Sequence, residues 1–205
     1  MIVNDMEQTE DRLAKQFAFL KELDQEKQIV RQTYLADGSR FENDAEHAWH
    51  MAVMALLLSE YSNEKIDLLK TIAMILIHDV VEIDAGDTYA YDEDLKKTQA
   101  IREQQAAERI FGLLPQDQGE RFRNLWEEFE ERKTPEARFA KAMDNFQPLM
   151  LNAASDGKTW EEHGIRLEQV LARNEKSKEG SKKLWEYVYE HFIMPSVEKG
   201  KLSRT

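Results

Sequence analysis

Ionisable side chains gather where the most apolar segment of this chain ends. Residues 72–77 are apolar and lead directly into His78 and Asp79, with Glu82 three residues further on. Buried charges are costly, so those that persist in proteins are paired or bind metal ions. A neutral imidazole beside a carboxylate suits divalent ions such as Mn²⁺, Co²⁺, Fe²⁺ or Zn²⁺. The segment therefore predicts one half of a metal site.

Two further candidate ligands come from distant segments. His47 lies in the first turns of an expected helix that precedes the apolar one, and helices adjacent in sequence commonly pack against each other. Asp144 borders the apolar face of a later expected helix, and Pro148 cannot donate a hydrogen bond to its carbonyl, so we expect a bend there. Taken singly, His47 fits a structural histidine and Asp144 a polar boundary residue. Only the joint pattern indicates a metal site.

Glu82 has the spacing of a residue that works beside the ligands. It follows His78 by four positions and Asp79 by three, so in a continuing helix all three would share one face. A carboxylate there can accept a proton from water during hydrolysis. The same spacing also fits an ordinary charge at a helix end. The surrounding sequence lacks HExxH, paired Glu-x-x-His, P-loop, GxSxG and GxGxxG motifs, which removes several competing chemistries.

The composition indicates a single all-α domain. The 205 residues include 8 Gly and 4 Pro, and no run of alternating apolar and polar residues is bounded by hairpin signals. We expect one helical bundle over residues 1–205, with the metal site in about residues 25–155 and residues 156–205 packed on it. The chain has no cysteine, which excludes disulfides, thiolate metal sites and cysteine nucleophiles.

The charge balance limits the possible partners. The chain carries a net charge of −12, so its surface should repel nucleic acids and anionic membranes, and a small anionic substrate would need a local cation. The first residues lack the basic start and apolar stretch of a signal peptide, and no run reaches the ~20 apolar residues of a membrane span. We expect a cytoplasmic protein.

The helices that must position these residues can be placed approximately. Capping pairs are expected at Asn43 with Glu46 and at Thr134 with Pro135, and Asn63 is expected to cap the apolar helix. His163 and His191 should lie on the surface. The expected helices cover one or two segments within residues 6–36, then about 43–61, 64–79, 93–111, 117–132, 135–150, 159–174 and 180–198.

Together these residues resemble the H…HD…D signature of the HD-domain metal-dependent phosphohydrolases. The stretch "SRFENDAEHAWHMAVMALLL" is similar to the first metal helix of that family, and "LIHDVVEIDAGD" to its HDxxExxxGD segment. "LLPQDQGERFRNLWEEFEERKTPEARFAKAMDNFQPLM" is similar to the C-terminal half of the 5′-deoxynucleotidase branch. The resemblance covers about residues 25–155.

The resemblance implies a site and a reaction. One divalent ion would be held by His47, His78, Asp79 and Asp144, and a (deoxy)nucleoside 5′-monophosphate would be hydrolysed to nucleoside and phosphate. By the same resemblance, Glu82 would assist the attacking water. The residues implied in substrate binding are Asp87 at the sugar, Thr88, Tyr89 and Ala90 along the pocket, and Arg31 at the phosphate.

Some assignments remain open at this stage. Arg31 is followed by Gln32, where bacterial members of the branch carry a tryptophan, and Tyr34 is a possible replacement for that ring. Arg40 is an alternative ligand for the phosphate. His50 could hydrogen-bond a ligand or the phosphate, or be purely structural.

Other functions fit parts of the same pattern. One is hydrolysis of another phosphoester, such as a nucleoside triphosphate or an alarmone, and another is a non-catalytic, metal-stabilised helical module that binds nucleotides. An HD-type oxygenase would need a second metal ion and additional histidines. We expect a homodimer, as in many relatives.

Overall fold

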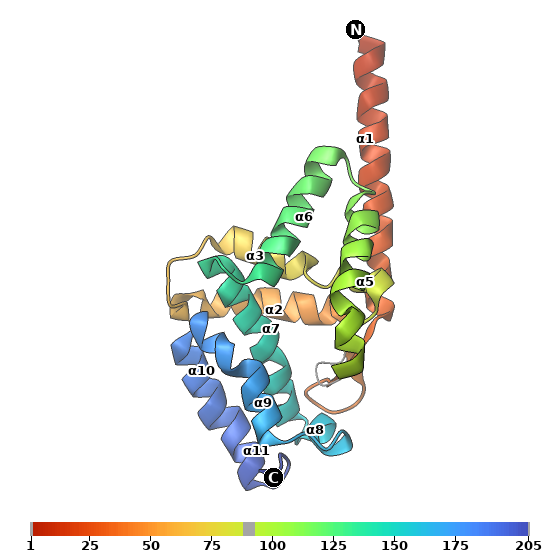
Figure 1. Ribbon diagram of the computed structural model, residues 1–205. Coiled ribbons are helices and arrows are strands. Elements are labelled where there is room, and N and C mark those ends of the chain that lie inside the picture. Colours follow the sequence, from red (N-terminus) through yellow and green to blue (C-terminus); the bar gives the residue numbers. More distant parts are fainter. Residues whose placement is uncertain (1, 88–92, 205) are drawn as a thin grey trace.

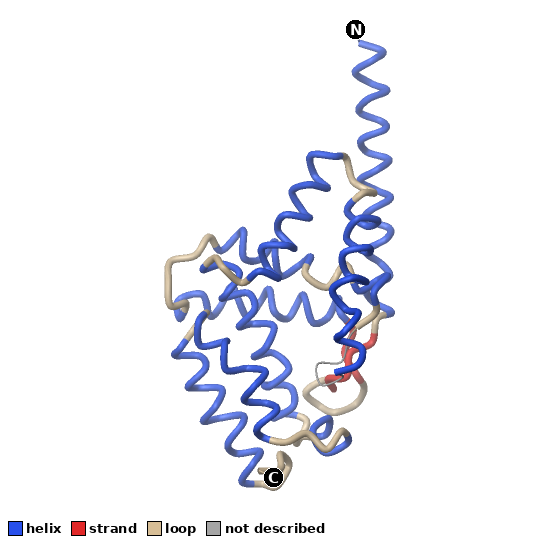
Figure 2. Tube along the Cα trace, in the orientation of Figure 1, coloured by secondary structure: helices blue, strands red, loops and turns tan. Residues whose placement is uncertain are grey.

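The chain folds into a bundle of helices with one small antiparallel ribbon. The computed structural model describes residues 2–87 and 93–204 (Figures 1 and 2). The predicted all-α class is confirmed. The α-helices are α1 (Ile2–Glu22), α2 (Asp44–Leu58), α3 (Leu68–Ile77), α4 (Glu82–Ala85), α5 (Glu93–Phe111), α6 (Gln116–Glu131), α7 (Pro135–Ala154), α8 (Lys158–Glu162), α9 (Leu167–Asn174), α10 (Lys182–Val188) and α11 (Met194–Glu198). The strands are β1 (Val30–Tyr34) and β2 (Phe41–Asn43). No helix of the described residues is both long and apolar enough to cross a bilayer.

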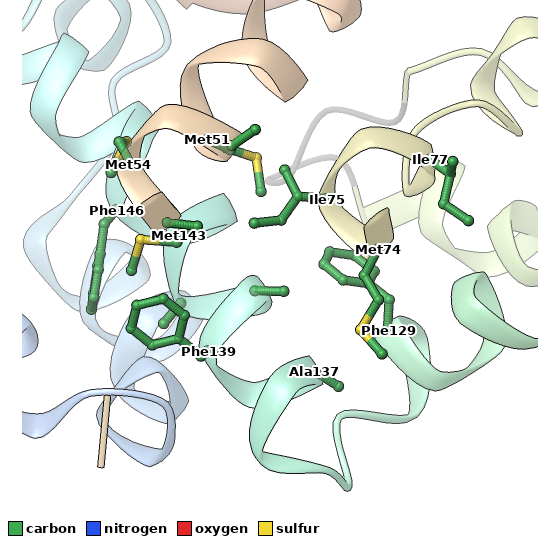
Figure 3. Packing of buried hydrophobic residues seen from close by; sticks show 14 of the residues in the cluster. Met51, Met54, Met74, Ile75, Ile77, Phe129, Ala137, Phe139, Met143 and Phe146 are labelled. Carbon is green, nitrogen blue, oxygen red and sulfur yellow. The ribbon is translucent and has the colours of Figure 1, made fainter. Parts of the chain in front are cut away.

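Helix α7 lies at the centre of the bundle and contacts α2, α3 and α6. Figure 3 shows side chains from these four helices gathered in one apolar cluster. The residues that are almost fully buried there include Met51, Met74, Ile75, Phe129, Phe139 and Met143. Burial of each such side chain contributes about 1.5–3 kcal/mol, so α7 is fixed firmly in the middle of the molecule.

The start of α2 is fixed by the predicted capping pair. The Asn43 side chain accepts a hydrogen bond from the backbone N–H of Glu46, and the Glu46 carboxylate accepts one from the N–H of Asn43. Such a reciprocal pair satisfies two amides that the helix itself cannot pair. It sets where α2 begins, and therefore places Asp44 and His47 in its first turn.

The predicted cap of α3 was wrong. The cap is Asp67, not Asn63: its side chain accepts a hydrogen bond from the N–H of Lys70, and α3 begins at the residue after Asp67. The Asn63 amide instead donates to the carbonyl oxygens of Lys178 and Glu179. Asparagine often caps a helix locally, but the Asn63 side chain is engaged in a long-range contact instead.

The apolar helix also ends earlier than we expected. α3 stops at Ile77, residues 78–81 form a turn, and α4 begins at Glu82. Val80 and Val81 are buried in this turn, so the chain stays in the core without remaining helical. Gly86, at φ 74°, then ends α4, as its position in the sequence predicted. A turn between two helices, and not a continuing helix, therefore brings Glu82 close to the ligands.

A short β-ribbon replaces the end of the opening helical region. β1 and β2 pair antiparallel, with Val30 opposite Asn43 and Tyr34 opposite Phe41. The rings of Tyr34 and Phe41 stack with centroids 4.2 Å apart. The prediction of helix up to residue 36 was wrong, because β-branched and aromatic residues favour a strand here. The ribbon holds Arg31 next to the start of α2.

The two C-terminal helices that we predicted are each divided. Gly164, at φ 60°, separates α8 from α9 within residues 159–174. A π-helical segment, Tyr189–Ile193, lies between α10 and α11. Elements of both segments contact α7.

Candidate metal centre

Three of the four predicted ligands meet in one buried group. His47 in α2, His78 at the end of α3 and Asp144 in α7 each place one ligand atom within 4.8 Å of the other two. His47 Nε2 lies 3.2 Å from Asp144 Oδ1, and His78 Nε2 lies 3.9 Å from the same oxygen. Two imidazoles and one carboxylate are donors that divalent transition metals accept.

The orientation of His78 leaves one nitrogen available to a ligand. Its Nδ1 lies 2.7 Å from the carbonyl oxygen of Ile75, so Nδ1–H donates there and Nε2 is the nitrogen that remains for a ligand. This Nε2 is buried and has no hydrogen-bond partner among the described residues. An unsatisfied buried nitrogen is costly, and a cation at this position would satisfy it.

His47 is oriented by a residue that the sequence analysis missed. Its Nδ1 lies 3.0 Å from Gln147 Oε1, while the Gln147 amide donates to Glu42 Oε2 at 2.8 Å. The amide therefore presents its oxygen to Nδ1–H, and His47 Nε2 is directed at Asp144. Gln147 follows Asp144 by three positions in α7, a spacing that places both on one helix face and could have revealed it.

A proton would compete with a metal ion for Nε2 of His47. Burial and Arg31 lower the pKa of His47, but hydrogen bonds to Asp144 and Glu42 outweigh them and raise it to about 9. A metal ion would have to displace that proton, as metal ions do at most histidine ligands.

Asp144 is kept ionised by a neighbouring lysine. Lys141 Nζ lies 3.1 Å from Asp144 Oδ2, one turn away on α7. Burial by itself raises the pKa of Asp144, but Lys141 and then His47 lower it to well below its usual range. The carboxylate is thus available as an anionic ligand.

Asp79, the fourth predicted ligand, joins the histidines to a second acidic group. Its Oδ2 lies 3.0 Å from His78 Nε2 and 2.7 Å from Arg31 Nη1. Burial favours the neutral form, but His78 and then Arg31 lower the pKa of Asp79 below its usual range. Asp44, Asp79 and Glu82 place ligand atoms within 4.8 Å of one another.

Glu82 in this second group is nearly buried. Burial raises its pKa well above the usual range, and the neighbouring charges of Asp79 and Asp44 raise it further, while Arg31 opposes them. Its Oε2 has no hydrogen-bond partner among the described residues. Glu82 can therefore hold or accept a proton beside the ligands.

A cavity of about 390 Å³ opens next to both groups. Its lining includes six predicted site residues, namely Arg31, His78, Asp79, Glu82, Asp87 and Asp144. It also includes three cations that the sequence analysis missed: Arg132, Lys141 and Arg173. Lys141 precedes Asp144 by three positions and could have been found by helix spacing, whereas Arg132 and Arg173 come from other elements.

Two predicted substrate residues lie apart from this cavity lining. Arg40 is exposed and forms a two-pronged ion pair with Glu46, at 2.6 and 2.8 Å, beside the cap of α2. His50 is half-buried, and its Nδ1 lies 3.3 Å from Gln147 Nε2. The predicted pocket residues Thr88, Tyr89 and Ala90 lie outside the residues that the structure describes.

A helical bundle that brings a histidine together with a His-Asp doublet and a distant aspartate beside one cavity has the defining features of an HD domain. The HD domain family model matches residues 23–185, and the chain belongs to this family. The predicted family is thus confirmed.

Individual relatives agree with this assignment. The chain is 30% identical over 133 residues to "5′-deoxynucleotidase HDDC2" of Homo sapiens. The matched region covers 64% of each protein. It is 30% identical over 136 residues to "5′-deoxynucleotidase hdd1" of Schizosaccharomyces pombe, covering 64% of this chain and 67% of that one. The match to the human relative thus spans less than two thirds of that protein's length.

A solved structure is similar over nearly the whole chain. It is the crystal structure of a predicted metal-dependent phosphohydrolase from Magnetospirillum magnetotacticum MS-1, with a TM-score of 0.90 and 46% sequence identity. The similarity covers 95% of this chain and 97% of that one.

Proposed function

We propose that the protein is a metal-dependent phosphohydrolase that converts (deoxy)nucleoside 5′-monophosphates to nucleoside and phosphate. The observation that carries the proposal is the unsatisfied Nε2 of His78, which faces Asp79 and Asp144 at the wall of the cavity. The names of the relatives, 5′-deoxynucleotidase and predicted metal-dependent phosphohydrolase, support the same reaction class.

In this proposal His47, His78, Asp79 and Asp144 hold one divalent ion, of the Mn²⁺, Co²⁺, Fe²⁺ or Zn²⁺ type. When bound, such an ion supplies Lewis acidity, which polarises phosphoryl oxygens and makes water more acidic. The protein contributes rigid donors, because His47 and His78 are both held through their other ring nitrogen.

Glu82 is the group that moves the proton. It lines the cavity next to Asp79, and its Oε2 is not engaged by another described side chain. In this role it removes a proton from the water that attacks phosphorus, and this proton passes to the 5′ oxygen of the nucleoside as the bond between phosphorus and that oxygen breaks. General bases act from hydrogen-bond distance, so the attacking water would lie between Glu82 and the phosphate.

Cations around the cavity would hold the phosphate. Arg31 and Lys141 lie closest to the candidate ligands, because each forms an ion pair with one of them. Asp87 lines the same cavity, and in this proposal it binds the sugar. The cavity volume of about 390 Å³ falls in the range of ~300–1,000 Å³ that is usual for small-molecule sites.

A phosphate-release assay tests the proposal. Protein treated with a chelator and reloaded with Mn²⁺, Co²⁺, Fe²⁺ or Zn²⁺ is supplied with ribo- and deoxyribonucleoside 5′-monophosphates. We expect inorganic phosphate with at least one metal, and none with His78→Ala. A panel of nucleoside triphosphates and alarmones distinguishes other phosphoesters, because these would release pyrophosphate or triphosphate. Equal signals from the wild type and His78→Ala would contradict the proposal.

We further propose that the protein acts as a cytoplasmic homodimer. Support for the dimer comes from α1, whose N-terminal half extends beyond the bundle in Figure 1. Leu13, Phe17 and Leu20 are exposed along one side of this helix, at a spacing of four and three residues. The cytoplasmic location rests on the composition alone.

A further inference from the structure

A second cavity adjoins the one at the metal centre. It has a volume of about 400 Å³ and lies where the end of α6, the first half of α7 and the 3₁₀ segment Glu175–Glu179 meet. The residues that line both cavities are Glu130, Arg132, Lys141 and Asn145. Because Lys141 Nζ lies 3.1 Å from Asp144 Oδ2, the shared wall reaches a candidate metal ligand.

Arg132, in this shared wall, has a backbone conformation that arginine rarely adopts. It ends α6 at φ 55° and ψ 31°, in the left-handed region, and its N–H donates to the carbonyl oxygen of Glu128. Glycine is the usual residue at such a helix end, because a Cβ atom is strained there. Residues held in strained conformations cluster at functional sites. An arginine at this position therefore points to a role for its side chain.

The guanidinium of Arg132 is available to a ligand. The next residue, Lys133, pairs with Glu131 at 3.1 Å, but no carboxylate of the described residues pairs with Arg132. A guanidinium presents several N–H groups in one plane, an arrangement that fits two oxygens of a phosphate. Because Arg132 lines both cavities, it can serve a phosphate in either of them.

Lys141 gives a second reason to expect an anion beside Arg132. Burial and the charge of Arg132 lower the pKa of Lys141, but Asp144 and then Glu130 outweigh them and raise it above its usual value. The two cations are thus close enough to repel each other. An anion bound between them would remove that repulsion.

The rest of the second cavity supplies donors that suit an oxyanion. Lys176 lines it, and so do the buried residues Asn145 and Ser177. The Asn145 amide donates to Ser177 Oγ at 2.8 Å. Since Ser177 Oγ accepts this hydrogen bond, its own hydrogen can be donated to a ligand.

Most of the carboxylates in this lining are already paired. Glu130 Oε1 lies 3.4 Å from Lys141 Nζ, and Glu131 pairs with Lys133. The third, Glu179, is exposed to water, which screens its charge. Among the described residues, the cavity therefore keeps an excess of cationic groups.

We propose that the second cavity is a subsite for a phosphate group beyond the one at the metal centre, and that Arg132 joins the two positions. The ligand class is a compound with two linked phosphate groups, such as a nucleoside 5′-diphosphate. Free phosphate is the other source of the same chemistry. The subsite depends on the proposed function, which places the first phosphate beside the metal ion.

Calorimetric titration with two probes tests the subsite. Methylenediphosphonate, whose P–C–P link resists hydrolysis, and inorganic phosphate are each titrated into protein that is loaded with Mn²⁺ and freed of excess ion. In Arg132→Gly we expect the affinity for the diphosphonate to fall by about 10- to 100-fold, the range for loss of a hydrogen bond between charged groups. The affinity for inorganic phosphate should change little.

Matched variants separate the subsite from general effects. Lys176→Met, at a residue that lines the second cavity alone, should also weaken the diphosphonate. Lys133→Met removes the neighbouring charge outside both linings and should change neither affinity. Glycine suits the left-handed backbone, so Arg132→Gly should unfold in urea at no lower a midpoint than the wild type. Should it fail to fold, Arg132→Asn provides the same comparison, because asparagine also tolerates this conformation.

The outcomes distinguish the sources of the phosphate. Equal losses of both probes in Arg132→Gly, shared by Lys176→Met, would assign the subsite to free phosphate. Unchanged affinities in Arg132→Gly would overturn the proposal. So would a loss that Lys176→Met does not share, because Arg132 would then serve the phosphate at the metal centre, or an equal loss in Lys133→Met. The titration requires no hydrolysis, so the expected binding without phosphate release contradicts the proposed function alone.

Discussion

At the scale of single residues, the site depends on how polar atoms are held rather than on which residue types are present. The sequence identified His47, His78, Asp79, Glu82 and Asp144 as a possible set. It could not show that Asp79 faces both a histidine and an arginine, because that depends on the turn after α3. Long-range pairing of this kind leaves no local signal.

Glu82→Gln tests the role of the proton acceptor. The amide has the same shape but cannot take a proton, so we expect hydrolysis to fall by about 10²-fold or more, with fold and metal content retained. Asp84→Asn is the control, because Asp84 lies on the same short helix but pairs with Arg109 at the surface. Unchanged hydrolysis in Glu82→Gln would instead support a non-catalytic, nucleotide-binding module. Phosphate release and elemental analysis are the measurements.

Gln147→Leu tests the support of His47. Loss of the amide removes the acceptor of Nδ1–H, and partners of metal-bound histidines typically affect metal affinity by about 10- to 100-fold. We expect weaker metal binding in a calorimetric titration. We also expect a free energy of unfolding lower by about 1–3 kcal/mol, because the buried Glu42 loses its donor. Gln105→Leu, at an exposed position on α5, should bind metal as the wild type does. Equal affinities of the two variants would contradict the role of Gln147.

Glu26 makes the stability of the metal-free protein depend on pH. Burial raises its pKa to about 8, and the charges of Asp79 and Asp44 add to the effect. A carboxyl group with a raised pKa in the folded state binds its proton more tightly there than in the unfolded chain. Its contribution is therefore fully present below the unfolded pKa, near 4.5, and is lost as the pH rises through about 8.

Glu26→Gln should remove this dependence. Relative to the wild type, the variant should gain up to about 1.4 kcal/mol of unfolding free energy per pH unit between pH 5 and 8. Urea unfolding of chelator-treated protein at several pH values measures the difference. Glu10→Gln, at an exposed position on α1, should show no such trend. Parallel curves for wild type and Glu26→Gln would contradict the prediction.

At the scale of elements, local signals predicted some boundaries well and failed elsewhere for identifiable reasons. The caps at Asn43 and Thr134 were found because their partners lie within a few residues. The cap at Asn63 was wrong because that side chain binds carbonyl oxygens more than 100 residues away. Likewise, residues 30–34 pair with a second short strand, and such pairing is not visible in a single segment.

Asn43→Ala tests how far the cap of α2 supports the site. Loss of an N-cap side chain typically costs about 0.5–2 kcal/mol, and here it also frees the turn that carries Asp44 and His47. We expect a lower midpoint in urea unfolding and weaker metal binding. Asn124→Ala, at an exposed position within α6, should change neither. Normal metal binding with reduced stability would show that the cap supports the helix but not the ligands.

At the scale of the whole molecule, the fold class and the family were predictable, and the lining of the cavity was not. The family motif lies in a few short segments of sequence. By contrast, Arg132 directly follows α6 and Arg173 lies in α9, and only the packing of these distant elements brings both arginines to the cavity. Their types and spacing therefore gave no reason to select them.

Phe17→Glu tests the proposed dimer. Arg12 and Phe19 face the bundle, through an ion pair with Asp117 and an edge contact with Phe122. Phe17 is exposed on the side of the helix away from Phe19. A charge at an apolar interface should dissociate it, so we expect the mass from light scattering to fall from dimer to monomer. Lys15→Glu places a negative charge on another side of α1 and should leave the mass unchanged.

A monomeric wild type would contradict the dimer without affecting the site. An unchanged dimer in Phe17→Glu would place the interface on another surface, such as the exposed leucines of α2 and α3. Those residues are Leu56, Leu57, Leu69 and Leu76.

Helix α7 carries core residues and site residues on the same turns. Phe139, Met143 and Phe146 are buried in the apolar cluster. Asp144 is a candidate ligand, Lys141 pairs with it, and Gln147 holds His47. The backbone that carries Asp144 is therefore anchored in a close-packed interior, which resists deformation. The distance between Asp144 and the histidines should stay narrowly distributed in solution. Substitutions deep in the core, far from any substrate, should broaden that distribution before they unfold the protein.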